Sequence, residues 1–348
     1  MQNLFLITLT LLLFFFYSYS LKFFRGLLDK INIIDQNYKK PQAFHHQPTP
    51  RIGGAFLLFS NLIIIASLFS FVNLNLNFYL YSILFFLVGF LDDIKILENP
   101  KIRFFTLILI ILIFILFEKI NISNTGIEYF TILIKNNTYI SIIFHLLCFL
   151  TIINGCNFID GFNGLLLIKA LIITCILLFI NFNNELSNIL IVFLTSILSI
   201  FFLNFPKAKI FMGDSGAYLI GFLISYFVIE TSNLNQSISP FFFCIILFYL
   251  FFEVIFSFFR KLLLKKNPLL PDQNHLHMLI YKALGNKIFS DKIKANFTTS
   301  IIINFIYVLI IIPSIFFMQN NLYCKIYFVI CLLVYLICYK LLIKNKVS

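Results

Sequence analysis

The sequence predicts an all-α integral membrane protein, a polytopic bundle of about eleven transmembrane helices that forms one domain over 1–348. Composition, apolar run length and charge distribution predict this class. The chain is 61% hydrophobic and 11% charged, with a mean hydropathy of +0.98. A soluble domain has roughly 45–50% apolar and about 25% charged residues. Almost the whole chain is therefore expected to lie in a bilayer.

Apolar runs close to the length of a membrane-spanning helix, about 20 residues, recur along the chain. The first run is longer than the apolar stretch of a signal peptide and lacks a small-residue cleavage site, so we expect it to be retained. The predicted spans are 3–24, 53–72, 78–92, 103–118, 138–155, 165–181, 187–205, 216–231, 239–259, 298–317 and 323–343.

The cations predict the orientation of these spans. With the N-terminus outside, all but three of the 26 Lys and Arg residues fall on the inner side; the exceptions are Lys119, Lys135 and Lys325. Cytoplasmic loops carry such an excess. We therefore expect an outer N-terminus and a cytosolic C-terminus. The net charge of +12 then reflects membrane topology, and we expect no nucleic-acid partner.

The other polar residues place any chemistry at the cytosolic face. All eight aspartates and four of the five histidines fall on the predicted inner side. His145 lies within a predicted span and is expected in the core. Glu253, two turns from Arg260, is expected to be satisfied locally. The seven cysteines are scattered without a Cys-x-x-Cys pair, which argues against a disulfide framework or a zinc site.

A polar stretch, 154–165, interrupts the apolar chain with the sequence Asn-Gly-Cys-Asn-Phe-Ile-Asp-Gly-Phe-Asn-Gly-Leu. Asn157, Asp160 and Asn163 recur every three residues, which would place them on one face of a helix. Polar groups at the end of membrane helices are costly unless they bind something. We therefore expect this stretch to contribute to a binding site.

Two earlier inner loops carry charged candidates. Arg51 follows Pro-Thr-Pro and precedes two glycines; it is either a phosphate clamp or a cation that sets topology. Asp92 and Asp93 close a predicted span. Adjacent carboxylates repel each other and are disfavoured at a helix C-terminus, so a role in binding a cation or as a base is favoured.

Two later inner loops add further candidates. Gly-Asp-Ser-Gly at 213–216, preceded by Lys207 and Lys209, opens a predicted helix. A helix N-terminus suits an anion or a carboxylate, although Asp214 or Ser215 could be a simple N-cap. The basic loop 260–294 carries His275-Leu-His277, which could bind phosphate or metal.

Together these residues predict phosphoryl transfer. Carboxylates and amides favour a hard cation, Mg²⁺ or Mn²⁺, and surrounding cations favour a phosphorylated substrate. Phosphoryl transfer consists mostly of positioning and of neutralising negative charge. A site at the inner bilayer surface suggests one water-soluble substrate and one lipid. The candidates for the carboxylate and amide ligands are Asp92, Asp93, Asp160, Asp214 and Asn157.

Five motifs between residues 35 and 278 resemble the polyprenyl-phosphate N-acetylhexosamine-1-phosphate transferases, glycosyltransferase family 4. They are Pro-x-Pro-Arg-x-Gly-Gly at 48–54, Leu-Asp-Asp at 91–93, Asn-x-x-Asp-Gly-x-x-Gly-Leu at 157–165, Phe-Met-Gly-Asp-Ser-Gly at 211–216 and Asn-His-Leu-His at 274–277. The resemblance implies a bacterial inner-membrane enzyme that transfers a sugar 1-phosphate from a UDP-N-acetylhexosamine to undecaprenyl phosphate. It also implies Mg²⁺ and the release of UMP.

The resemblance further implies residue roles. Asp214 would be the metal ligand, with Asn157 as a partner. The predicted catalytic carboxylates are those of Asp92, Asp93 and Asp160. Asp92 and Asp93 would lie beside the lipid phosphate, and Asp160 would help to hold uridine or metal. Substrate binding would fall to Arg51, Arg103, Asn163, Lys209, His275 and His277.

One departure bears on the choice of substrate. Relatives often carry a further histidine after His-Leu-His, whereas this chain has Met278. The peptidoglycan enzymes carry a His-His-His type motif, so its absence argues against phospho-N-acetylmuramoyl-pentapeptide transferase. A transporter or lipid-binding protein without chemistry is the alternative of another class. The sequence leaves the sugar, the pathway and the oligomeric state open, including a homodimer.

Overall fold

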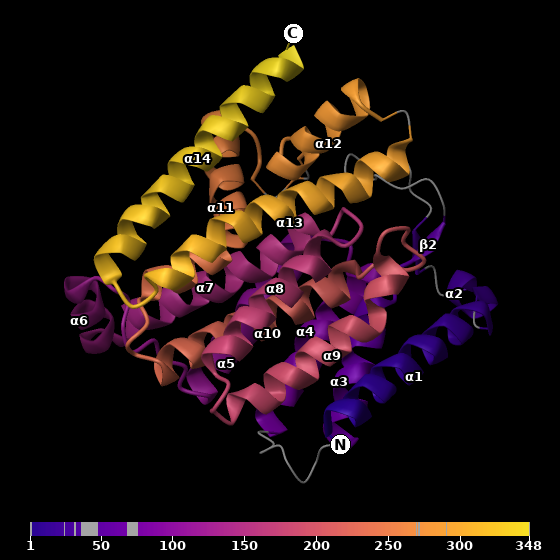
Figure 1. Cartoon of the computed structure of the whole chain (residues 1–348), viewed down its shortest axis with the longest axis horizontal. Coiled ribbons are helices and arrows are strands. Elements are labelled where there is room, and N and C mark those ends of the chain that lie inside the picture. The colour runs from indigo at the N-terminus through magenta and orange to yellow at the C-terminus, as the bar shows by residue number, and fades with distance from the viewer. Residues whose placement is uncertain are drawn as a thin grey trace.

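The structure, a computed structural model, is almost entirely helical (Figure 1). It describes residues 2–23, 25–30, 33–35, 48–67, 76–268, 270, 272–289 and 291–347. The helices are α1 (Gln2–Phe23), α2 (Arg25–Lys30), α3 (Gly53–Ser67), α4 (Leu76–Asp93), α5 (Pro100–Phe117), α6 (Glu128–Asn136), α7 (Thr138–Ile159), α8 (Leu165–Ile180), α9 (Leu186–Asn204), α10 (Gly213–Leu234), α11 (Pro240–Leu263), α12 (Leu276–Lys287), α13 (Lys292–Phe316) and α14 (Asn321–Val347). Two short strands, β1 (Ile34–Asp35) and β2 (Thr49–Pro50), pair antiparallel.

Each of the eleven predicted spans coincides with a helix in its described part; residues 24 and 68–72, at the ends of two of these spans, lie outside the described residues. Within the described residues, eight helices are long and apolar enough to cross a membrane: α1, α5, α7, α9, α10, α11, α13 and α14. Helices α3, α4 and α8 account for the other three predicted spans. The chain is therefore a polytopic membrane protein, whereas eleven crossings and an outer N-terminus stay predictions. The short helices α2, α6 and α12 lie outside all eleven predicted spans.

Local sequence signals fix several helix starts. Asn99, Asn137 and Ser239 each accept a hydrogen bond from a backbone N–H group in the first turn of α5, α7 and α11. Asn and Ser are favoured at this position because the first N–H groups of a helix lack partners within the helix. Pro100 and Pro240 stand at the first helical position, where no N–H is needed.

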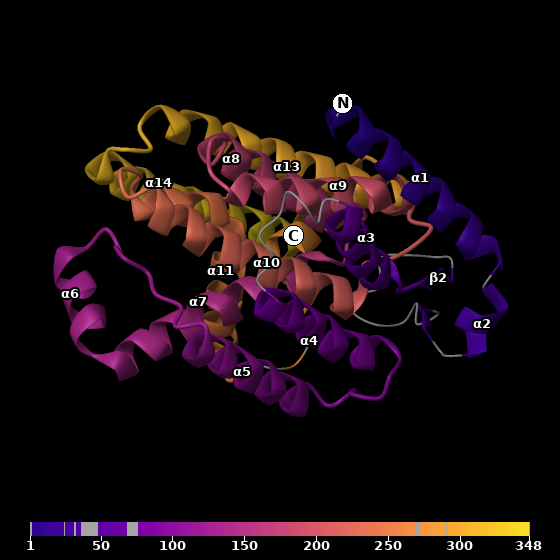
Figure 2. The ribbon, with the colours of Figure 1, turned by 90° about the horizontal axis from the view of Figure 1, so that it is seen from below.

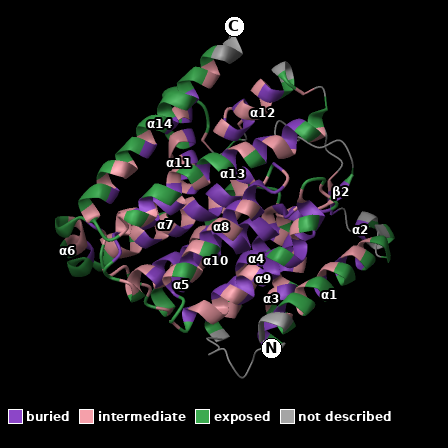
Figure 3. Cartoon of the chain, in the orientation of Figure 1, coloured by how far each residue is buried: buried purple, intermediate pink, exposed green. Residues whose placement is uncertain are grey.

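Helix α10 is the core of the bundle. It packs against α3, α4, α7 and α8, and its residues are buried on all sides (Figure 3). Phe222, at its middle, stacks on Phe85 with 4.5 Å between ring centroids and meets the edge of Phe114 at 5.0 Å. A helix that is apolar all round is stable only when other helices surround it. The packing of α10 therefore holds the residues at its ends in place.

The outer helices expose apolar side chains, as expected of lipid-facing surfaces. Helices α1 and α14 lie on opposite flanks and show mostly exposed and intermediate residues (Figure 3). Leu12 of α1 is 65% exposed and Leu322 of α14 is 62% exposed. Such surfaces would be a liability in water and are the ordinary surface of a bilayer protein.

The connections gather at two opposite ends of the helices. Elements α2 and β2 lie at one end and α6 at the other (Figures 1 and 2), and α12 lies at the same end as β2 (Figure 1). The first of these ends also holds the end of α4, the end of α7 and the start of α10, because side chains from these positions contact one another. The five motifs are thus brought to one end of the bundle.

Candidate active site

A carboxylate from α4 caps the N-terminus of α10. Asp93 accepts hydrogen bonds from the backbone N–H groups of Asp214 and Ser215, each at 3.0 Å, and from Ser215 Oγ at 2.7 Å. These N–H groups have no partner within the helix, and a negative charge is favoured at a helix N-terminus. Asp93, 2% exposed, therefore fixes where α10 begins.

Two glycines let the backbones approach this closely. A Cβ on Gly89 of α4 would lie 2.3 Å from the backbone nitrogen of Ser215. Gly213 has a φ of +72°, and a Cβ there would lie 2.5 Å from Asp93 Oδ2. L side chains rarely adopt that φ. Part of the Gly-Asp-Ser-Gly pattern thus follows from backbone geometry.

Arg103 of α5 joins carboxylates from two other helices. Its Nη1 donates to Asp214 Oδ2 at 2.9 Å and also to Asp92 Oδ2. Two carboxylates this close would repel each other without a cation. The side chains of Asp92 and Asp214 are 14% and 16% exposed, whereas that of Asp93 is fully buried. Of the two adjacent aspartates, Asp92 is therefore the one accessible to a ligand.

The end of α7 completes a carboxylate cluster, which consists of Asp92, Asp93, Asp160, Asp214 and the amide of Asn157. Asn157 Nδ2 lies 3.5 Å from Asp214 Oδ2 and 3.3 Å from the hydroxyl of Tyr218. Burial, and then the nearby Asp214 and Asp93, raise the pKa of Asp160 well above its usual range. A bound cation would oppose that shift.

The polar stretch 154–165 is not one helix. Helix α7 ends at Ile159 and α8 begins at Leu165, so Asn163 lies in the turn between them. Its Nδ2 donates to the backbone oxygen of Pro206 at 2.9 Å. Asn157, Asp160 and Asn163 would share a face only in a continuous helix, and the chain turns after Asp160, so they do not. Asn163 anchors the loop between α9 and α10.

Arg51 reaches the cluster because two motifs hydrogen-bond to each other. The backbone N–H of Phe211 donates to Pro50 at 2.9 Å, and that of Gly53 donates to Phe211 at 2.9 Å. Arg51 pairs with Asp35, on the paired strand β1, and its Nη1 lies 3.8 Å from Asp93 Oδ1. Although burial opposes the charge, Asp35, Asp214 and Asp93 hold the pKa of Arg51 above its usual value.

The two histidines of the His-Leu-His motif lie at the start of α12 and pack near the end of α7. His275 stacks on His277 with 5.4 Å between ring centroids, and it lies 4.9 Å from the ring of Phe158, the residue after Asn157. His277 is fully buried, and its Nδ1 is 3.1 Å from the hydroxyl of Tyr249. Burial, and then the neighbouring His275, lower the pKa of His277 to about 3. His277 is therefore a neutral packing residue in this conformation.

Lys209 is exposed on the α9–α10 loop, and only its backbone is fixed, by a 2.7 Å hydrogen bond to Leu203. The structure brings its side chain to none of the cluster residues that it describes. His145 is buried in the core as expected, with Nδ1 2.6 Å from the backbone oxygen of Ser141.

Sequence reasoning gave Asp35 and Tyr218 no role in the site and named Ser215 only as a possible N-cap. Asp35 holds Arg51, Ser215 donates to Asp93, and Tyr218 lies 3.4 Å from Asp214. Tyr218 follows Asp214 by four residues, so the helical period would have placed the two on one face. The sequence gave no such signal for Asp35. It lies sixteen residues before Arg51 in the chain, and only the pairing of β1 with β2 brings the two side chains together.

The donor set of the cluster fits a hard divalent cation. Asp92, Asp214 and Asn157 supply the carboxylate and amide oxygens that Mg²⁺ accepts. Within the described residues, no three His, Cys, Asp or Glu side chains converge as a metal site. The Nη1 of Arg103 lies between Asp92 and Asp214, where the two carboxylates favour a positive charge.

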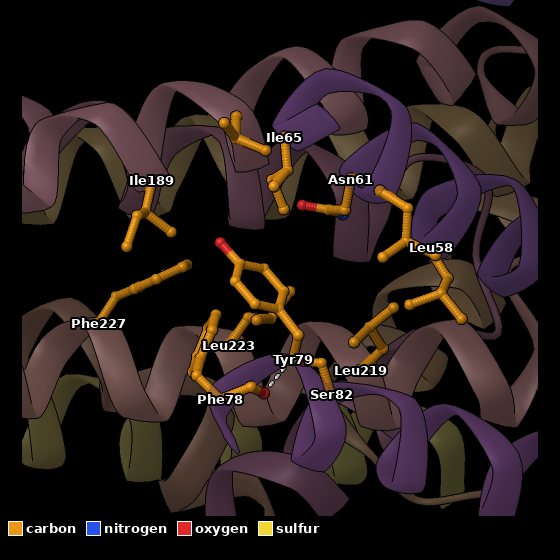
Figure 4. A pocket seen from close by; sticks show the side chains of 12 residues that line it. Leu58, Asn61, Ile65, Phe78, Tyr79, Ser82, Ile189, Leu219, Leu223 and Phe227 are labelled. Atoms are coloured by element: carbon orange, nitrogen blue, oxygen red, sulfur yellow. Dashed lines mark hydrogen bonds between the residues drawn. The ribbon is translucent and has the colours of Figure 1, made fainter. Parts of the chain in front are cut away.

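A separate apolar pocket lies between α3, α4, α9 and α10 (Figure 4). The ring of Tyr79 projects into it near Asn61 and Ile65, and the Tyr79 hydroxyl has no hydrogen-bond partner among the described residues. None of the residues that line this pocket belongs to the carboxylate cluster.

Comparison with known proteins decides the family. The model of glycosyl transferase family 4 matches residues 75–232. A phospho-N-acetylmuramoyl-pentapeptide-transferase of Prochlorococcus marinus is 30% identical over 66% of this chain and 68% of its own length. The chain belongs to glycosyl transferase family 4.

Both branches of the family appear among its relatives. The undecaprenyl-phosphate alpha-N-acetylglucosaminyl 1-phosphate transferase of Thermotoga maritima is 28% identical over 69% of this chain and 71% of its own length. A probable undecaprenyl-phosphate N-acetylglucosaminyl 1-phosphate transferase of Bacillus subtilis is 31% identical over 36% of each chain. The matched region of the family model includes Asp92, Asp93, Asn157, Asp160 and Asp214, so the cluster lies within the part shared with the family.

Proposed function

We propose that this glycosyl transferase family 4 chain transfers an N-acetylhexosamine 1-phosphate from a UDP-sugar to undecaprenyl phosphate and releases UMP. The observation that carries the proposal is the convergence of Asp92, Asp214 and Asn157 with Arg103 at one end of a membrane bundle. With a divalent cation bound between the carboxylates, that arrangement would neutralise anions beside the bilayer, as a water-soluble diphosphate and a lipid phosphate require. The product would begin a cell-surface polysaccharide.

The reaction exchanges one phosphorus–oxygen bond for another. An oxygen of the lipid phosphate attacks the sugar-linked phosphorus of the UDP-sugar, and the bond from that phosphorus to the bridging oxygen breaks. UMP leaves with the bridging oxygen. Both reactants are anions, so catalysis depends on position and on neutralised charge. Arg51 and Arg103 would supply the guanidiniums that neutralise the reacting phosphates.

Asp92 and Asp93 take different parts in this proposal. Both carboxylate oxygens of Asp93 accept hydrogen bonds from backbone N–H groups at the N-terminus of α10, so Asp93 positions Asp214. Asp92 is the more accessible of the two and would face the lipid phosphate. A phosphate monoester has a second pKa near 6 and is already largely ionised at neutral pH, so no base is required.

Asp214 and Asn157 would hold Mg²⁺, with Asp92 beside them. A bound Mg²⁺ screens the repulsion between the two phosphates and stabilises charge on the oxygens of the transferring group. Asp160 lies near Asp214 and would help to hold the nucleotide or the metal. This Mg²⁺ dependence is part of the proposal, as are the cytosolic location of the site and a bacterial inner membrane.

Exchange of labelled UMP into UDP-N-acetylglucosamine in membranes tests the reaction. We expect Mg²⁺-dependent exchange that Asp214→Asn abolishes, and retained exchange in that variant would refute the metal assignment. A panel of UDP-sugars then identifies the donor. Lipid product from the UDP-muramoyl-pentapeptide alone would instead favour the peptidoglycan reaction named for several relatives.

A further inference from the structure

Glu253 of α11 is a fully buried carboxylate in an apolar helix. Such a group is costly in a membrane bundle unless it is paired and hydrogen-bonded. Its Oε1 lies 2.9 Å from His275 Nδ1 and accepts the backbone N–H of Leu276 at 3.2 Å. Its Oε2 accepts the hydroxyl of Tyr335, on α14, at 2.6 Å. Glu253 is therefore satisfied locally, as the sequence predicts, and its ring partner is His275 of the His-Leu-His motif.

The nearest cation on the same helix does not pair with Glu253. Arg260, two turns further along α11, pairs with Asp272 and donates to the backbone oxygen of Asn274 at 2.6 Å and to the hydroxyl of Tyr339 at 2.6 Å. Arg260 thus anchors the backbone of the loop before His275. Since Arg260 already holds this loop in place, Glu253 is not needed to anchor the loop backbone. We therefore look for the role of Glu253 in its contact with the ring of His275.

The contact of Glu253 with His275 selects one ring nitrogen. An ionised carboxylate only accepts hydrogen bonds, so Nδ1 of His275 must carry the hydrogen that it donates. Nε2 of His275 makes no hydrogen bond within the described residues, while the ring packs against Phe158, next to the Asn157 that contacts Asp214. The His275 side chain is 2% exposed, and Nε2 is the ring nitrogen left for a ligand that reaches it.

We propose that Glu253, supported by Tyr335, is a positioning residue that keeps the hydrogen of His275 on Nδ1 and so presents Nε2 to the nucleotide sugar. The proposal rests on the proposed function for the identity of that ligand. The tautomer of His275 itself does not depend on the function, and it can be measured without a substrate.

The first test is the tautomer of His275 in purified, ¹⁵N-histidine-labelled protein, with the His275→Ala difference spectrum assigning the signals. We expect Nδ1 to carry hydrogen in the wild type and in Glu128→Gln, which alters an exposed glutamate on α6. Glu253→Gln offers both an amide acceptor and an amide donor, so we expect a mixture of tautomers. A wild-type signal for hydrogen on Nε2 alone overturns the proposal.

The second test is a double-mutant cycle on sugar 1-phosphate transfer. We expect Glu253→Gln to lower kcat/KM for the UDP-sugar by about tenfold or more, the usual cost of losing a group that orients a ligating histidine. In the His275→Ala background the same change should have no further effect. A kcat/KM within twofold of wild type, or independent losses that multiply, overturns the proposal.

A second variant covers the case in which Glu253→Gln fails to fold. Tyr335→Phe keeps the ring that packs on Phe252 and Phe256 and removes only the hydroxyl bond to Glu253. We expect a smaller loss in the same direction and a partial change of tautomer. If the wild type transfers no sugar 1-phosphate at all, the proposed function fails while the tautomer still decides the role of Glu253.

Discussion

Asp93 Oδ1 lies 3.0 Å from the backbone nitrogen of Asp214 and accepts its hydrogen. The carboxylate that ends α4 therefore holds the backbone of the residue whose own carboxylate lies at the centre of the cluster. Two aspartates adjacent in sequence consequently have unlike environments, because Asp92 points to Arg103 and Asp93 to the N-terminus of α10.

This difference predicts opposite behaviour of two matched variants. Asp93→Asn removes a buried charge that accepts three hydrogen bonds, which should cost about 1–3 kcal/mol of stability. Asp92→Asn should leave stability near the wild-type value and abolish UMP exchange. Thermal unfolding in detergent, followed beside the exchange assay, separates the two. Equal melting temperatures of the two variants would contradict the capping role of Asp93.

Arg103 links cation binding to stability. Arg103→Ala leaves the carboxylates of Asp92 and Asp214 without the cation that they share, so the variant should unfold at a lower temperature than the wild type. Mg²⁺ should restore more stability to Arg103→Ala than it adds to the wild type, because any ligand that binds only the folded state stabilises it. Thermal unfolding with MgCl₂, against NaCl at equal ionic strength, measures this. An equal response of the two proteins to Mg²⁺ would argue against a cation site between Asp92 and Asp214.

Gly89 sets the distance between α4 and α10. Gly89→Ala would place a Cβ 2.3 Å from a backbone atom, and backbone cannot move aside as a flexible side chain can. We expect a loss of about 1–3 kcal/mol, the usual cost of overpacking, together with loss of activity. Gly285→Ala on α12, which meets nothing within 4 Å, is the matched control and should be neutral or stabilising by up to about 1 kcal/mol. Similar unfolding curves for the two variants would refute the close approach.

His277 predicts how stability depends on pH. Its folded pKa is about 3, against about 6.5 in an unfolded chain. Below pH 6.5 the unfolded chain binds a proton that the folded protein does not, so stability falls as pH falls from about 6.5 towards 3. At pH 5 this amounts to about 2 kcal/mol. His277→Gln should reduce the difference between melting temperatures at pH 7.5 and pH 5, whatever its absolute stability. An unchanged difference would show that His277 is protonated in the folded state.

Composition and pattern were sufficient for the class, the long apolar helices and most of the candidate residues that the structure brings together. Each predicted span meets a helix. Four of the polar motifs predicted for the inner face contact one another around Asp214, and the histidine motif adjoins them through Phe158. The helices and the end of the bundle at which the polar residues gather follow from hydropathy and charge. Both act through the free energy of transferring each residue from water to lipid, which does not depend on the other residues. Motif order along the chain carried the family resemblance.

The sequence alone determined that this protein is a polytopic membrane protein with carboxylates, amides and cations gathered at one end. Only the tertiary structure decided which carboxylate does what: Asp93 caps α10, Asp92 shares Arg103 with Asp214, Asn163 holds a loop, and Glu253 faces His275. The physical reason is that such pairings depend on the rotation and spacing of helices far apart in the chain. Hydropathy shows which polar residues lie outside the lipid. Packed contacts, such as that of Gly89 with Ser215, determine which of those polar residues contact one another.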